Sequence, residues 1–227
     1  MTADRVICWR HGRTAHNHSG TWQGQLDIPL DDTGRTQAAQ AAEAIAASVK
    51  PGDGLTVVSS DLARARVTAE SLAAVAGVEV RLDRRLREID AGRWQGLTKT
   101  EIVEAGMGDE LAAWQAQEDI RIGGGERRSE VSARGAEAIQ EHAAALDGGA
   151  LVVVAHGGLL RGSIVQLLGL DGRCWNLLGV LGNGQWAELF PGQPAWRLVA
   201  YNLAATPIGS RFGSAPHPRD RLSEPQR

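Results

Sequence analysis

Lysine and cysteine are both scarce in this chain of 227 residues. Only Lys50 and Lys99 of the 24 basic residues are lysines, and the rest are arginines. Genomic base composition can cause such a bias, but arginine also suits anion recognition, because guanidinium binds phosphate through a planar, bidentate fork. The two cysteines, Cys8 and Cys174, lack the CxxC spacing of metal or redox sites and are too few for a disulfide framework. We expect both to be packing residues.

Long hydrophobic runs and a strong net charge are also missing. The apolar run Leu151 to Ala155 is far too short to span a membrane, and Asp4 and Arg5 interrupt the first ten residues where a signal peptide would be apolar. The formal net charge is −3, which gives no general attraction to nucleic acid or anionic lipid. We therefore expect a cytoplasmic protein with neither a nucleic-acid nor a membrane partner.

Short apolar strands alternate with helical patterns along most of the chain. Strands are predicted at residues 5–10, 55–59, 78–82 and 151–155, with helices at 33–49, 61–76, 129–146 and 157–168. Two or three further strands are predicted between 175 and 201, with a hairpin turn at Gly182-Asn183-Gly184. This pattern indicates an α/β fold, a three-layer α/β/α sandwich around a mostly parallel sheet.

A single domain is expected to span residues 1–204. Within it, residues 83–128 show a looser pattern, with short helices near 99–104 and 110–117, and are predicted to form a lid or substrate segment. Residues 205–227 are rich in proline and lack a periodic apolar pattern, so a disordered tail is predicted there.

Two histidines directly follow predicted strands. His11 follows the first strand and His156 follows the strand that ends at Ala155. The carboxyl ends of parallel strands line the crevice where ligands bind in open α/β sheets, so both histidines should face one rim. Gly157 opens the next helix, whose free N–H groups favour an anion. With Arg10 beside His11 and Arg64 early in the helix after the second strand, the sequence predicts a phosphate pocket.

Several short motifs together resemble those of the histidine phosphatase superfamily, also called the phosphoglycerate-mutase-like family. They are Arg10-His11-Gly12-x-Thr14-x-x-Asn17, Gln23-Gly24-x-x-Asp27-x-Pro29-Leu30, Thr33-Gly34-Arg35-x-Gln37-Ala38, Ser59-Ser60-Asp61-Leu62-x-Arg64-Ala65-x-x-Thr68-Ala69, Leu86-x-Glu88 and Val154-Ala155-His156-Gly157-Gly158. The resemblance covers most of the chain and implies a phosphoglycerate mutase-like fold.

The resemblance implies a catalytic role for five residues. His11 would be the nucleophile that attacks phosphorus to give a phosphohistidine. Arg10, Arg64 and His156 would hold the phosphoryl oxygens and stabilise the charge of the transition state. Glu88 would protonate the leaving oxygen and later activate water. Asp90 and Glu101 are alternative carboxylates for this role, and the Leu-x-Glu match favours Glu88.

Further substrate contacts are expected from polar and glycine residues around these five: Arg13, Thr14, Asn17, Gln23, Gly24 and Gly157. Arg13 stands where the family usually has Glu or Gln, and Arg127 stands where it usually has Ser. Either arginine could favour a doubly anionic substrate. Trp22 is a candidate for the wall of the substrate pocket. His16 and His18 beside His11 could suggest a metal site, but no cysteine or clustered carboxylate completes one and the family uses none. No metal and no cofactor are expected.

The resemblance favours hydrolysis over a mutase reaction. Residues 22–27 and 92–98 follow the phosphatase branch, and residues 23–38 and 175–186 are similar to a subfamily of actinobacterial glucosyl-3-phosphoglycerate phosphatases. We expect a phosphomonoester hydrolase that acts on a phosphorylated small metabolite of this kind, and a homodimer, which is common in the family. The alternatives are a broad-specificity acid or sugar phosphatase, a cofactor-dependent phosphoglycerate mutase, and a binding module without turnover.

Overall fold

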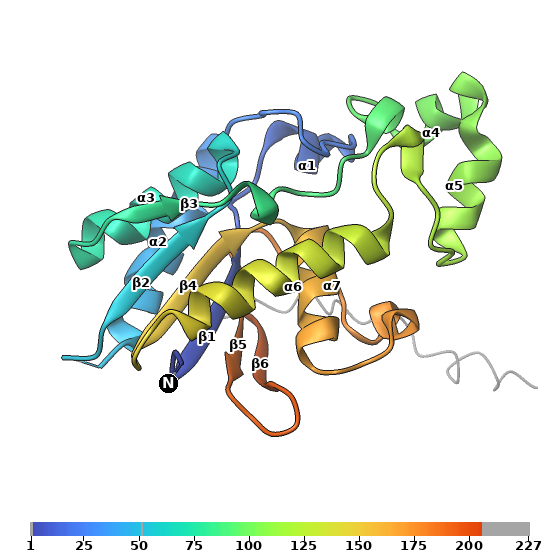
Figure 1. Ribbon diagram of the computed structural model, residues 1–227. Helices are drawn as coiled ribbons and strands as arrows, with labels where there is room; N and C mark the ends of the chain where they lie inside the picture. Colours follow the sequence, from blue (N-terminus) through green and yellow to red (C-terminus); the bar gives the residue numbers. More distant parts are fainter. Residues whose placement is uncertain (1, 51, 206–227) are drawn as a thin grey trace, which may run out of the picture.

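The computed structural model describes residues 2–50 and 52–205, whose centre is one six-stranded sheet (Figure 1). The strand order is β3-β2-β4-β1-β5-β6. The first four in this order are parallel: β3 (Val80–Leu82), β2 (Leu55–Ser59), β4 (Ala150–Ala155) and β1 (Arg5–Arg10). Next to β1, β5 (Trp186–Phe190) runs antiparallel, as does β6 (Arg197–Leu203) next to β5. The predicted mostly parallel sheet is confirmed.

Helices cover both faces of this sheet (Figure 1). α2 (Asp32–Ser48) and α3 (Ala63–Ala76) lie on one face, while α6 (Arg128–Ala144) and α7 (Gly157–Leu167) lie on the other. Alternate residues of a strand point to opposite faces, so Ile7 and Trp9 pack with α2 and α3, whereas Val6 and Cys8 pack on the other side. All six residues of β4 are buried. The three layers follow from these strands being apolar on both faces.

Short elements connect β3 to α6. They are η1 (Arg84–Leu86), η2 (Gly92–Trp94), α4 (Lys99–Ile102), η3 (Val103–Met107), α5 (Gly108–Gln115) and η4 (Ile122–Gly124). In Figure 1, α4 and α5 stand beyond the ends toward which β1 and β4 point. Trp114 of α5 and Trp94 of η2 both pack edge-on against Trp22 of the loop after β1, with ring centroids 5.8 and 5.0 Å apart. This aromatic cluster fixes the segment over the end of the sheet.

Two local predictions need correction. Residues 15–19 form α1 (Ala15–Ser19), where no helix is predicted from the sequence; Thr14 caps α1 by accepting the N–H of Asn17. The turn Gly182-Asn183-Gly184 does not join two strands, because it lies between η5 (Gly172–Leu177) and β5. The hairpin turn between β5 and β6 is formed by residues 191–196. Nearly all of the predicted tail, residues 206–227, lies outside the described residues.

The remaining sequence expectations concern cysteines and membrane spans. Cys8 is buried, Cys174 is partly exposed, and both are free thiols. Burial raises the pKa of Cys8 to about 12, in keeping with a packing role. Among residues 2–50 and 52–205, no helix has the length and apolar character needed to cross a membrane.

Candidate active site

The two strand-end histidines face each other across neighbouring strands. Arg10 and Ala155 are register partners in the parallel pair β1–β4, and the N–H of His11 continues this ladder by donating to the carbonyl of Ala155 at 3.0 Å. The residues that directly follow these two strand ends are His11 and His156. Their ring centroids are 5.1 Å apart, close to the roughly 4.8 Å that separates adjacent strands. The predicted convergence of the two histidines is confirmed.

The ring of His11 is held in one orientation by its own backbone. Its Nδ1 lies 2.7 Å from the carbonyl oxygen of Gly12, and because a carbonyl only accepts, Nδ1 carries the hydrogen. Burial lowers the pKa of His11 well below its ordinary value, and the charges of Arg64 and Arg10 lower it further. The imidazole is thus neutral near pH 7, with its free lone pair on Nε2.

His156 is fully buried and also neutral. Burial lowers its pKa, and Arg64 adds to the effect. Its Nε2 lies 2.9 Å from the hydroxyl of Ser60, at the end of β2, while its Nδ1 has no hydrogen-bond partner. A buried polar atom without a partner is costly, so Nδ1 is a candidate contact for a bound ligand.

Arg10 and Arg64 supply positive charge at the same rim. Arg64 is 1% exposed and donates to the carbonyls of Leu26 and Gly24 at 2.7 and 2.8 Å, and Arg10 donates to the carbonyl of Leu181 at 2.5 Å. Neither has a carboxylate partner within the described residues, and both leave a buried Nε unpaired. Burial lowers the pKa of Arg64 to about 10 and lowers that of Arg10 as well, so both are charged at neutral pH.

Glu88 lies on the N-terminus of α7. Its carboxylate accepts the backbone N–H groups of Gly158 and Leu159 at 3.0 Å and that of Ile89 at 2.9 Å. The predicted anion site at this helix end is therefore occupied by the protein's own carboxylate. A side chain at position 158 would collide with it, because a Cβ there would be 2.7 Å from Oε1 of Glu88. Glycine is required here by close approach.

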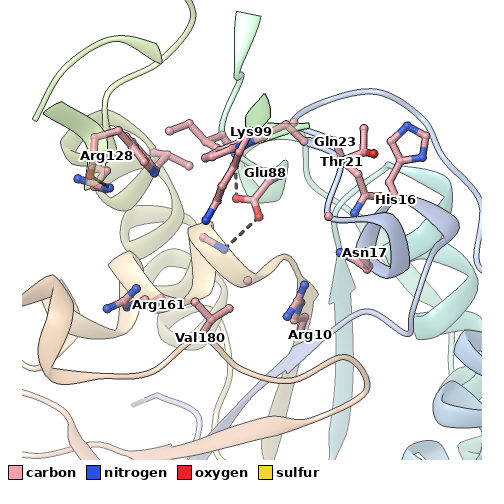
Figure 2. A pocket seen from close by; sticks show the side chains of 18 of the residues that line it. Arg10, His16, Asn17, Thr21, Gln23, Glu88, Lys99, Arg128, Arg161 and Val180 are labelled. Carbon is pink, nitrogen blue, oxygen red and sulfur yellow. Dashed lines mark hydrogen bonds between the residues drawn. The ribbon is translucent and has the colours of Figure 1, made fainter. Parts of the chain in front are cut away.

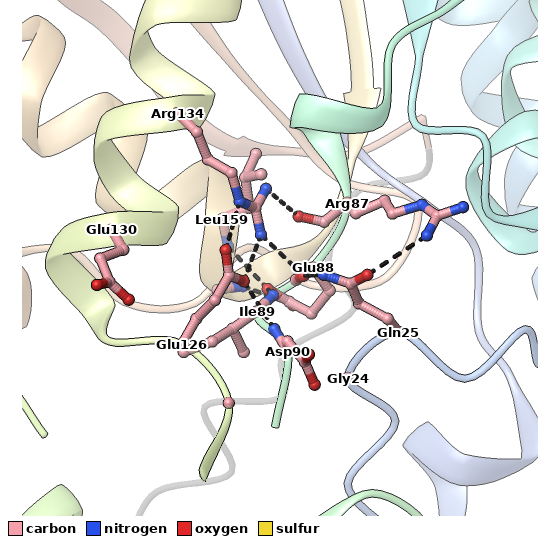
Figure 3. Close-up of polar contacts among 12 residues, drawn as sticks. Gly24, Gln25, Arg87, Glu88, Ile89, Asp90, Glu126, Glu130, Arg134 and Leu159 are labelled. Atoms are coloured by element: carbon pink, nitrogen blue, oxygen red, sulfur yellow. Dashed lines mark hydrogen bonds and ion pairs between the residues drawn. The ribbon is translucent and has the colours of Figure 1, made fainter. Parts of the chain in front are cut away.

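Arg134 of α6 clamps the backbone that carries Glu88 (Figure 3). Its guanidinium donates to the carbonyls of Arg87 and Glu88 at 2.6 and 3.0 Å and forms an ion pair with Glu126 at 2.8 Å. Glu126 in turn accepts the N–H of Asp90 at 2.8 Å. Of the alternative carboxylates, Glu101 accepts the N–H and the hydroxyl of Thr98, the N-cap of α4, and neither it nor Asp90 lines the cavity described next. The geometry favours Glu88, as the sequence did.

A cavity of about 700 Å³ opens above these residues (Figure 2). Of the predicted substrate contacts, Asn17, Gln23, Gly24 and Gly157 line it, as does Trp22. His156 is fully buried beside His11, which lines the cavity. Five basic residues line the cavity: Arg10, Arg64, Lys99, Arg128 and Arg161. Glu88 is the single carboxylate among the lining residues. The chain is acidic overall, so this concentration of positive charge is local and marks an anion site.

The other predicted substrate contacts lie elsewhere. The side chain of Arg13 pairs with Asp31 at 2.8 Å, and the hydroxyl of Thr14 is buried against Gln23 at 2.9 Å; neither lines the cavity. Arg127 caps α6 and donates to the carbonyl of Asp119 at 2.6 Å. In this geometry Thr14 orients Gln23, and Arg13 holds the start of α2.

Sequence reasoning missed Asn183, Lys99, Arg128 and Arg161. Asn183 donates its amide to the carbonyls of His11 and Gly12 at 3.2 and 3.4 Å and to Oδ1 of Asn17 at 3.1 Å, so the glycine turn around it braces the nucleophile loop. The signal that could have found Arg161 is its place one helical turn after Gly157. Lys99 begins the short helix α4, and Arg128 is the first residue of the long helix α6, one position before the predicted start at residue 129.

The family model described as the histidine phosphatase superfamily, branch 1, matches residues 6–204. The chain belongs to this superfamily. The fold and the enzyme class expected from the sequence, a hydrolase of phosphate monoesters, are confirmed with it.

This histidine phosphatase has close relatives of known name. It is 40% identical over 221 residues to a glucosyl-3-phosphoglycerate phosphatase of Mycobacterium tuberculosis, an alignment that covers 90% of this chain and 97% of the relative. The structure of mycobacterial glucosyl-3-phosphoglycerate phosphatase with VO3 matches with a TM-score of 0.80 at 39% identity, over 89% of this chain and all of the other. An Entamoeba histolytica phosphoserine phosphatase with 3-phosphoglyceric acid matches with a TM-score of 0.75 at 26% identity, over 88% and 97%.

In the part of this histidine phosphatase that the structure describes, no group of three or more His, Cys, Asp or Glu side chains is arranged to hold a metal ion. His16 lines the cavity but belongs to no such group.

Proposed function

We propose that this chain hydrolyses glucosyl-3-phosphoglycerate to glucosylglycerate and phosphate, without a metal, through a phosphohistidine on Nε2 of His11. The observation that carries the chemistry is the Nδ1 hydrogen bond of His11 to the carbonyl of Gly12. It leaves a neutral imidazole with its lone pair on Nε2, beside two arginines that lack carboxylate partners. Such a group is a nucleophile at neutral pH.

In the first step, Nε2 of His11 attacks phosphorus and the bond between phosphorus and the ester oxygen breaks. Arg10, Arg64 and Nδ1 of His156 hold the phosphoryl oxygens, and Glu88 gives its proton to the departing oxygen. In the second step, Glu88 takes a proton from water, the resulting hydroxide attacks phosphorus, and the P–N bond breaks to restore His11.

The substrate assignment is supported by the relatives and by the size of the cavity. A volume of about 700 Å³ is within the range of small-molecule sites and far exceeds what a phosphate alone requires. Trp22, Trp114 and Trp175 line its wall. Flat, amphipathic indole rings of this kind can pack against the apolar face of a sugar ring.

The test is phosphate release in the presence of excess chelator, measured for glucosyl-3-phosphoglycerate, glucose 6-phosphate and p-nitrophenyl phosphate. We expect the highest kcat/KM for glucosyl-3-phosphoglycerate. In His11→Ala, turnover of all three esters should vanish. Comparable kcat/KM for all three esters would instead establish a broad-specificity phosphatase. An undiminished rate in His11→Ala, or loss of activity with the chelator, would contradict the mechanism.

We further propose a cytoplasmic homodimer. Two exposed apolar side chains support the dimer: Leu177 of η5 is 72% exposed, and Val199 of the edge strand β6 is 61% exposed. Two free, widely separated cysteines suit a reducing compartment. Light scattering after size exclusion should give twice the chain mass, and Leu177→Asp should reduce it to the monomer. A monomeric wild-type protein at micromolar concentration would refute the dimer.

A further inference from the structure

The cavity has a second cationic end, remote from the predicted phosphate pocket. In Figure 2, Arg10 and Asn17 lie on one side, Arg128 and Arg161 on the other, and Glu88 with Lys99 between them. All of these residues line the same cavity. The phosphoryl chemistry proposed above uses one end only, so the two arginines at the other end have no role in it.

Arg128 is built into the protein as a charged wall. It is 7% exposed and lies 3.3 Å above the centroid of the Trp114 ring and 5.4 Å from that of Trp175. It donates to the carbonyls of Trp114 and Glu118 at 2.7 and 3.2 Å, while its buried Nε has no partner. These contacts hold the guanidinium rigidly without neutralising it, and they leave N–H donors unused.

Arg161 reaches the same place from α7. It lies 5.1 Å from the centroid of the Trp175 ring and donates to the carbonyl of Trp175 and to Oδ1 of Asn176 at 2.8 and 3.0 Å. No carboxylate forms an ion pair with either arginine in the portion of the chain that is described. Burial lowers the pKa of Arg128 to about 10, and the charge of Arg161 adds to this effect. Two like charges that are held together without a paired carboxylate favour the binding of an anion from solution.

The first turn of α7 sets the spacing between the two ends. Gly157 packs against the guanidinium of Arg10, and Gly158 carries the Glu88 carboxylate. Arg161 follows four residues after Gly157, which is about 6 Å along the helix axis. This separation suits one small molecule that carries a phosphate at one end and a second negative group a few bonds away.

We propose that Arg128 and Arg161 form a second anion subsite, which binds a carboxylate of the phosphate ester and selects carboxylated substrates. This proposal rests on the hydrolase function proposed above and names the substrate class for it. Arginine binds carboxylate through paired, charge-assisted hydrogen bonds, and the tryptophan rings exclude water around it. Esters with an uncharged alcohol in place of the carboxylate lose this interaction.

The test compares kcat/KM for 3-phosphoglycerate and glycerol 3-phosphate, which differ in a carboxylate against a hydroxymethyl group. We expect the wild-type protein to favour 3-phosphoglycerate, and Arg161→Gln to lower the ratio of the two values about 10- to 100-fold, mainly through KM. Arg161→Lys keeps the charge and should restore part of the ratio. Arg173→Gln, which removes an exposed arginine paired with Asp171 outside the cavity, should leave the ratio as it is.

Arg128→Gln serves as a second variant, read together with its unfolding midpoint, because Arg128 also holds the backbone of residues 114–118. A wild-type ratio near one, or a ratio that Arg161→Gln changes less than twofold, would overturn the carboxylate subsite. Failure of the hydrolase function itself would look different: the wild-type protein would release no phosphate from either ester or from p-nitrophenyl phosphate.

Discussion

Gly158→Ala is expected to damage the proposed acid while leaving the fold intact. Gly158 is the second residue of α7 and needs no positive φ, so alanine suits its backbone and should contribute about 0.5–1 kcal/mol to helix stability. The added Cβ would lie 2.7 Å from Oε1 of Glu88, whereas ordinary contacts begin near 3.4 Å. The carboxylate must therefore move by roughly 0.7 Å, which weakens its three backbone hydrogen bonds.

A displacement of this size should lower kcat about 10- to 100-fold, because misplacing a catalytic group by about 1 Å costs on the order of 100-fold. The loss should be largest for alkyl phosphates, whose leaving oxygen needs a proton, and small for p-nitrophenyl phosphate. The free energy of unfolding, measured in urea, should stay within about 1 kcal/mol of the wild type.

Gly108→Ala is the matched control, since Gly108 begins α5 and a Cβ there meets only ordinary contacts with Val103. It should leave kcat unchanged. Full activity of Gly158→Ala toward an alkyl phosphate would refute the placement of Glu88 as the acid. An equal loss for both leaving groups would mean that the substitution disturbs phosphate binding and not proton transfer.

Three further predictions follow from the site. The free energy of unfolding should fall as pH drops below about 6.5, because His11 and His156 have lowered pKa values and take up protons only on unfolding. Two such groups give a slope of at most about 2.7 kcal/mol per pH unit. An unfolding midpoint in urea that is equal at pH 7.5 and pH 5.5 would contradict this prediction. Asn183→Ala should reduce kcat about 10-fold with little change in KM, since the Asn183 amide holds the backbone of His11 and the side chain of Asn17. Steady-state kinetics that show a change in KM alone would argue for direct contact between Asn183 and the substrate. Arg13→Gln should change kcat/KM less than threefold, because its guanidinium pairs with Asp31 away from the cavity, and a tenfold rise in KM would restore Arg13 as a substrate ligand.

The sheet and the phosphate pocket could be predicted because strand-end residues have fixed positions. Once Arg5–Arg10 and Ala150–Ala155 are strands of one parallel sheet, His11 and His156 must lie at the same rim. Side-chain direction outside regular elements could not be predicted. Arg127 and Arg128 are adjacent, yet Arg127 is the extended N-cap residue and donates to the carbonyl of Asp119, whereas Arg128 begins α6 and turns into the cavity. Asn183 was hidden in a turn whose sequence is typical of hairpins.

The strand register between β1 and β4 has a consequence for how this catalyst can change. His11 and His156 follow paired residues of neighbouring strands, so folding sets the distance between them and no ligand has to enforce it. The groups at the other end of the cavity come from short elements between residues 83 and 128 and from α7. Insertions or substitutions in those short elements can reshape the recognised alcohol without touching the histidine pair. An engineer can therefore vary the alcohol that is recognised while the histidine pair stays in place, provided that Glu88, which lies within residues 83–128, is kept.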